Sequence, residues 1–84
     1  MGHNTVNVIL NMHKRNISAD IEIPLDISAN ELVVALNTAY ELGIDTSDIK
    51  RCYLKSENPI ALIKGGKTLR QLGIHDGSFI NFTE

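Results

Sequence analysis

Cysteine and aromatic residues are scarce in this chain of 84 residues. Cys52 is the only cysteine, which excludes an internal disulfide and favours a reducing, cytoplasmic setting. The chain has no tryptophan, two tyrosines and two phenylalanines, so a core must be built mainly from Ile, Leu and Val. No apolar run is long enough to cross a bilayer, and no signal-peptide core follows the N-terminus. Direct insertion into a membrane is therefore not expected.

Basic residues are missing from one long segment and concentrated in the next. Residues 16–49 carry seven acids and no Lys or Arg, whereas residues 50–70 carry a net charge of +5. A basic face of this kind can recruit an acidic partner, and the alternative is that the two segments pair with each other within one domain. Nucleic-acid binding is not expected, because Tyr53 is the only aromatic residue among the basic ones.

No arrangement of side chains points to catalysis, a metal or a cofactor. Gly65-Gly66-Lys67-Thr68 resembles the end of a phosphate-binding loop, but Ala61 stands where that motif needs glycine. The three histidines are scattered without ligand spacing, and Cys52 has no neighbouring base. We therefore expect a non-enzymatic chain with no cofactor, no metal and no small-molecule substrate.

The only long helix is predicted from Ser28 to Gly43. Ser28 and Glu31 fit a capping box, and an apolar face recurs at helical spacing. Gly43 is expected to close the helix, with Ile44 folding back on its last turn. The predicted apolar face comprises Leu32, Leu36, Ala39 and Gly43, with Ala35 and Tyr40 beside them.

Strand patterns occupy most of the remaining chain. Residues 6–12 and 17–25 alternate apolar and polar side chains around a polar break, which predicts a hairpin with Pro24 at a frayed end or sheet edge. After the helix, with Ile49 as a buried anchor, short strands are predicted at 51–55 and 60–63, with a loop at 56–59. A helical connector at 68–74 and a closing strand at 79–83 follow. This order predicts one α+β domain over residues 1–84, with residues 1–4 flexible and one helix across a mixed sheet.

The segment Thr68–Ile80, TLRQLGIHDGSFI, resembles the connector "TLxxLGIxDGxxI" that leads into the last strand of ubiquitin-like proteins. The chain resembles this β-grasp fold (ββαββ with a short helical connector) over nearly its whole length. The resemblance implies that Leu69 and Ile74 fill the end of the core and that Gly77 permits the final turn. Conjugating members end in a flexible Gly-Gly, whereas this sequence ends in Thr83-Glu84, so conjugation and sulfur transfer are not expected.

Among non-conjugating members the chain is most similar to the YukD/EsaB type, small cytosolic components of type VII (WXG-substrate) secretion systems. That resemblance implies a docking or regulatory subunit whose partners are membrane-bound secretion components, including an ATPase. Two alternatives stay open: the small ubiquitin-like subunit of a multicomponent di-iron monooxygenase, and a general ubiquitin-like adaptor.

The resemblance also implies a binding surface on the open face of the sheet. Alternation along the strands predicts four outward residues there: Ile9, Tyr53, Phe79 and Asn81. Four basic residues are expected to frame them: Lys50, Arg51, Lys55 and Lys64. The alternative is that these apolar residues are scattered singly over the surface, as is normal.

Overall fold

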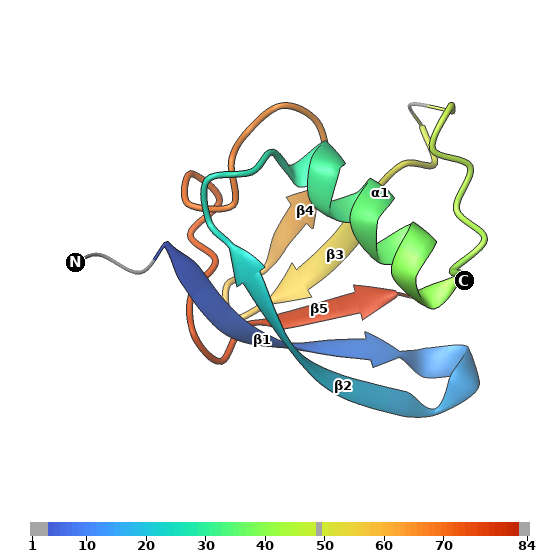
Figure 1. Ribbon diagram of the computed structural model, residues 1–84, viewed down its shortest axis with the longest axis horizontal. Coiled ribbons are helices and arrows are strands. Elements are labelled where there is room, and N and C mark those ends of the chain that lie inside the picture. The colour runs from blue at the N-terminus through green and yellow to red at the C-terminus, as the bar shows by residue number, and fades with distance from the viewer. Residues whose placement is uncertain (1–3, 49, 83–84) are drawn as a thin grey trace.

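The computed structural model describes residues 4–48 and 50–82, which form a mixed five-stranded sheet with one α-helix across one face (Figure 1). The strands are β1 (Thr5–Met12), β2 (Ile17–Pro24), β3 (Leu54–Glu57), β4 (Ala61–Ile63) and β5 (Phe79–Phe82), and the helices are the 3₁₀ helix η1 (His13–Arg15) and α1 (Ala29–Tyr40). The order in the sheet is β2-β1-β5-β3-β4, with β1 and β5 parallel and every other pair antiparallel. The predicted α+β arrangement is confirmed.

The register of the strands separates a helix-facing side of the sheet from an open side. Leu10 on β1 lies beside Ile80 on β5, and Ile80 lies beside Ser56 on β3. All three are buried beneath α1. One residue along, Asn11, Asn81 and Lys55 form the corresponding row on the opposite, open side. The core therefore lies between α1 and one face of the sheet, and the other face carries no helix.

The connector between β4 and β5 closes one end of the core. Leu69 and Ile74 are buried, as expected, and the Leu69 N–H donates to the Ile27 carbonyl at 3.1 Å. The Leu72 N–H donates to the Thr68 carbonyl, but the connector consists of hydrogen-bonded turns and contains no assigned helix. The expected helical connector is thus corrected to a series of turns.

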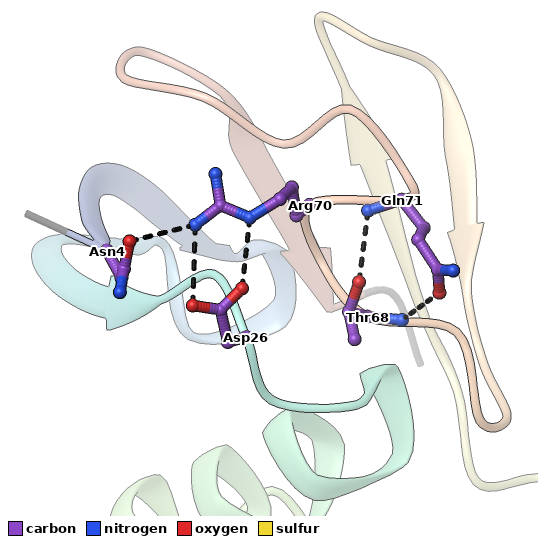
Figure 2. Close-up of polar contacts among 5 residues, drawn as sticks. All are labelled: Asn4, Asp26, Thr68, Arg70 and Gln71. Carbon is purple, nitrogen blue, oxygen red and sulfur yellow. Dashed lines mark hydrogen bonds and ion pairs between the residues drawn. The ribbon is translucent and has the colours of Figure 1, made fainter. Parts of the chain in front are cut away.

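Side-chain hydrogen bonds fasten this connector to the segment between β2 and α1 (Figure 2). The Arg70 guanidinium donates to both carboxylate oxygens of Asp26, at 2.9 and 3.4 Å, and to Asn4 Oδ1 at 3.1 Å. Thr68 and Gln71 each accept from the other's backbone N–H, which is the reciprocal pattern of a capping box. We call this region, Asn4, Asp26, Thr68, Arg70 and Gln71, the connector cluster. Residues 1–4 are predicted to be flexible; residues 1–3 lie outside the described residues, and for Asn4, which accepts the Arg70 hydrogen bond, flexibility stays a prediction.

The start of α1 follows the sequence closely. Ser28 Oγ accepts from the Glu31 N–H at 3.1 Å, and the Ser28 N–H donates to Glu31 Oε1 at 3.2 Å. These two bonds satisfy donors that have no partner within the helix, so the predicted capping box is confirmed.

The end of α1 differs from the prediction. The helix ends at Tyr40, and Glu41 closes it in the left-handed conformation. Gly43 also has the expected positive φ, but it lies beyond the end of the helix. Arg15 makes the earlier ending possible, because its guanidinium donates to the carbonyls of Tyr40 (2.6 Å) and Glu41. The buried face is also rotated from the prediction. Ala29, Leu32, Val33 and Leu36 are buried, whereas Ala35 and Ala39 are exposed.

Strand boundaries shift where pairing overrides local sequence signals. The expected strand at 51–55 and loop at 56–59 become β3 at 54–57, because Ser56 and Glu57 pair with Ile80 and Phe79 of β5. β4 begins at Ala61 and leaves Ile60 outside the sheet. β2 is an edge strand ending at Pro24, as predicted, but Ile17 at its other end is 50% exposed next to the turn. The predictions for Ile49 and Thr83 fall outside the described residues.

Candidate functional site

An apolar pair occupies the middle of the open face. Ile9 on β1 lies directly beside Phe79 on β5, and both side chains are half-buried. Asp20 on β2 pairs with Ile9 on one side, and Glu57 on β3 pairs with Phe79 on the other. The two apolar residues predicted for this face are thus adjacent, as alternation implied, but acidic residues border them on both sides.

Asn81 has a different role from the one predicted. Alternation places it correctly on the open face, but only 6% of its surface is exposed. Its Oδ1 accepts from Asn11 Nδ2 at 3.0 Å and lies 3.4 Å from His13 Nε2, while its Nδ2 donates to Glu57 Oε1 at 2.7 Å. Neighbouring side chains from β1, η1 and β3 therefore cover Asn81 and use its hydrogen-bonding groups. Asn81 positions these neighbours and is not an exposed contact residue.

A concave surface lies where β3 begins and β5 ends, facing the loop that follows α1. Basic residues and a tyrosine line it from the β3 side, and the loop lines it from the α1 side. We call this surface the basic groove; its lining residues are Leu42, Gly43, Ile44, Asp45, Lys50, Arg51, Tyr53, Leu54, Lys55, Asn81 and Phe82. Five of the eight predicted site residues therefore come together here: Lys50, Arg51, Tyr53, Lys55 and Asn81.

The other three predicted residues lie elsewhere. Ile9 lines a separate concavity with Asp20 and Glu22 of β2, and Phe79 lies beside Ile9. Lys64 lines a third concavity with Ser28 and Cys52, near the start of α1. Ile9, Phe79 and Lys64 thus lie outside the basic groove, and a single binding surface formed by all eight residues stays a prediction. Strand alternation gives the face of the sheet, but it does not give the position of loop residues such as Lys64.

The Leu42–Asp45 loop forms one wall of the basic groove, and the sequence analysis did not predict it. Asn37 of α1 holds Ile44 with two hydrogen bonds, from Asn37 Nδ2 to the Ile44 carbonyl at 3.1 Å and from the Ile44 N–H to Asn37 Oδ1 at 2.8 Å. This pair fixes the loop against the helix end, with Ile44 packed on the core. The sequence predicts that Ile44 folds back on the last turn of the helix, but it does not predict that this loop lines a groove.

The charges in the groove are mostly uncompensated. Among the described residues, Lys50 and Lys55 form no ion pair, and Arg51 makes one contact, from Nε to Asp48 Oδ2 at 3.6 Å. Asp45 is the only acid in the lining, and its Oδ1 accepts from both Ser47 Oγ and the Ser47 N–H. The Ser47 side-chain hydrogen bond, helped by the backbone one, lowers the pKa of Asp45. The groove therefore holds three cations against one carboxylate.

A second apolar feature, also missed, lies at the β4 edge of the sheet. Ile60 is 90% exposed and Leu62 is 49% exposed, and both line a shallow concavity with His13 and Lys55. The sequence indicates this feature through the run Pro59-Ile60-Ala61-Leu62, in which side chains that point to opposite faces of the sheet are all apolar. Lys55 pairs with Leu62 across the two strands and therefore borders both concavities.

Metal-ligating side chains do not converge at any point of the described chain. Within residues 4–48 and 50–82 no three His, Cys, Asp or Glu side chains gather as metal ligands. Cys52 is buried, with its Sγ 3.1 Å from Asn30 Oδ1. The same residues include no helix with the length and apolarity needed to cross a bilayer.

Comparison with solved structures supports a ubiquitin-like fold. A designed protein based on ubiquitin matches with a TM-score of 0.64 at 12% identity, covering 98% of this chain and 90% of the designed one. The C-terminal ubiquitin-like domain of mouse tubulin-specific chaperone e matches with a TM-score of 0.69 at 8% identity, covering 96% of this chain and 89% of that chain. At these identities the likeness concerns the fold alone. No curated protein sequence matches the chain.

The family is decided by a model of the YukD protein of the WXG100 protein secretion system (Wss), which matches residues 4–81. The chain belongs to the YukD family. The resemblance seen in the sequence is thereby confirmed, and the protein is a ubiquitin-like member of a secretion-associated family. The YukD match spans the connector cluster and all of the basic groove except Phe82.

Proposed function

We propose that this YukD-family protein is a non-catalytic docking subunit of a WXG100 secretion system, acting at the cytoplasmic side. It binds membrane-bound secretion components by non-covalent contact and does not become conjugated to them. The observation that carries the proposal is the basic groove at the start of β3 and the end of β5, where Tyr53 is 36% exposed between Lys50, Arg51 and Lys55. The family match over residues 4–81 supplies the secretion context.

The composition of this surface favours protein binding. Tyrosine and arginine are typical of contact residues that carry much of the binding energy, because they bury a large area and also hydrogen-bond. Apolar side chains from the Leu42–Asp45 loop and β5 lie behind them, and lysines form the rim. A partly apolar centre with a charged rim is a common interface arrangement.

The test is affinity capture from native cells with the purified full chain, analysed by mass spectrometry. We expect the wild type to recover membrane components of the secretion system and Tyr53→Ala to lose most of them. Val34→Ala is the matched control, because Val34 is exposed to a similar degree but lies on α1, away from the sheet. Equal recovery by all three proteins would contradict the proposal. Covalent adducts with other proteins would contradict the non-conjugating mechanism, and a recovered hydroxylase would favour the monooxygenase alternative.

A further inference from the structure

We infer that the basic groove takes a short acidic segment of the partner protein, anchored by one aromatic or large apolar side chain. This inference rests on the proposed function and names the chemistry of the partner at the same surface. It follows from three features of the groove: its charges, its apolar wall and the charges elsewhere on the open face.

The first feature is the local excess of positive charge. Lys50, Arg51 and Lys55 lie within one concavity, and the two lysines form no ion pair with any described residue. Asp45, the only opposing carboxylate in the lining, is already hydrogen-bonded to Ser47. Carboxylates of a bound segment would therefore meet cations that the fold leaves without partners. Such pairs increase the rate of association and suppress wrong partners.

The second feature is the apolar surface within the same concavity. Tyr53 is 36% exposed, and the half-buried Ile44 and the buried Phe82 line the same concavity. The space next to Gly43 is open, because a Cβ atom added there would meet no atom within 4 Å. An apolar side chain placed here loses contact with water, which provides affinity that charge pairs alone supply poorly.

The third feature is the opposite charge across the sheet. Asp20 and Glu22 of β2 lie beside Ile9 on the far side of the open face. Glu57 of β3 pairs with Phe79, two residues along the strand from Lys55. These acidic residues repel an acidic segment, whereas the cations of the groove attract it. Repulsion and attraction together therefore define where the segment binds. Long polyanions fit less well, since they would also approach the acidic residues, and one exposed tyrosine does not form a stacking platform for bases.

The inference is tested by fluorescence anisotropy with the full chain and a labelled acidic peptide that has one central phenylalanine. A second peptide keeps the phenylalanine but replaces each carboxylate by its amide. We expect the acidic peptide to bind on the order of tenfold more tightly, with affinity falling as salt rises. Lys55→Glu should weaken that binding at least on the order of tenfold, because it places a like charge in the groove.

Lys67→Glu is the matched control, since Lys67 is an exposed lysine outside the groove and the charge change is identical. Thermal denaturation confirms that both variants are folded. Equal weakening by the two variants, or equal binding of the two peptides, would overturn the inference. So would a single-stranded oligonucleotide of the same charge that competes more strongly than the acidic peptide. If the chain still captures secretion components through Tyr53 but ignores the acidic peptide, this inference fails and the proposed function stands.

Discussion

The connector cluster and the basic groove use the same kind of residue for opposite purposes. In the cluster, the Arg70 guanidinium is held by Asp26 and Asn4 (Figure 2). In the groove, Lys50 and Lys55 have no such partners among the described residues, and Arg51 has only a long contact to Asp48. The cations of both regions, Arg70 in the cluster and Lys50, Arg51 and Lys55 in the groove, come from the same segment with a net charge of +5, so net charge alone does not distinguish them. The difference separates a cation that the fold pairs, Arg70, from the two lysines that it leaves without an ion pair among the described residues.

The largest expected effect is on the stability of the connector region. Leu69→Ala removes a fully buried side chain that closes the core, so we expect the free energy of unfolding to fall by about 2–5 kcal/mol. Urea denaturation measures this loss. Leu62→Ala is the matched control, because the same atoms are removed from a half-exposed position, and its cost should stay below about 1 kcal/mol. Equal costs would mean that the connector does not close the core.

The next effect concerns the start of α1, which the connector also supports. The Ala29 N–H donates to the Lys67 carbonyl, and Ser28 pairs with Thr68. Ser28→Ala removes the acceptor for the Glu31 N–H and should cost about 1 kcal/mol in the free energy of unfolding. Ser28→Asp keeps an acceptor in place and should retain most of the stability. A loss as large for the aspartate as for the alanine would contradict the capping role.

A smaller expected effect is the pH dependence of the stability that Asp26 contributes in the connector cluster. The Arg70 hydrogen bond, followed by its charge, lowers the pKa of Asp26 from the ordinary 3.8. A carboxyl whose pKa is lower in the folded state stabilises the fold above its unfolded pKa, and this contribution is lost as pH falls through the folded value. The wild type should therefore exceed Asp26→Asn in stability at neutral pH, and the gap should close as pH drops below about 4.

A double-mutant cycle controls this pH experiment. In an Arg70→Met background, Asp26→Asn should have little remaining effect at neutral pH, because the partner of the carboxylate is already gone. Denaturation midpoints of the four proteins, followed between neutral and acid pH, give the comparison. An undiminished effect of Asp26→Asn in that background would assign the stabilisation to another group.

The smallest expected effect on stability belongs to the groove. Lys55 forms no ion pair with a described residue, so Lys55→Ala should change the free energy of unfolding by less than about 0.5 kcal/mol. Chemical denaturation provides the check. A loss comparable to that of Ser28→Ala would mean that Lys55 serves the fold, and the contrast between the two regions would no longer hold.

Local sequence signals predicted the fold well where the deciding contacts are between residues that are close in sequence. The Ser28–Glu31 capping box and the alternation along β1 depend on near-neighbour spacing. The burial of Leu69 and Ile74, in contrast, was implied by the resemblance of the connector to ubiquitin-like proteins. The helix end was wrong because Arg15, which is far away in sequence, binds the last carbonyls of α1. The predicted end of the strand at Lys55 was wrong because Ser56 and Glu57 pair with β5 and extend β3 to Glu57.

The candidate site was predictable only in part, for the same reason. Alternation placed Ile9, Phe79 and Asn81 on the open face, but it did not show that Asn11 and Glu57 cover Asn81. Alternation also does not show where loops lie, so it did not predict that Lys64 lines a different concavity or that the Leu42–Asp45 loop forms one wall of the groove. Contacts between distant segments decide each of these points, and a single sequence carries little signal for them.

The most direct test of the docking surface is site-specific photo-crosslinking in native cells. A benzophenone-bearing amino acid replaces Tyr53 in the basic groove or, in a matched protein, Lys67 outside it. We predict that the probe at position 53 captures a membrane component of the secretion system and that the probe at position 67 does not. Capture from position 67 without capture from position 53 would contradict the assignment of the groove as the docking surface.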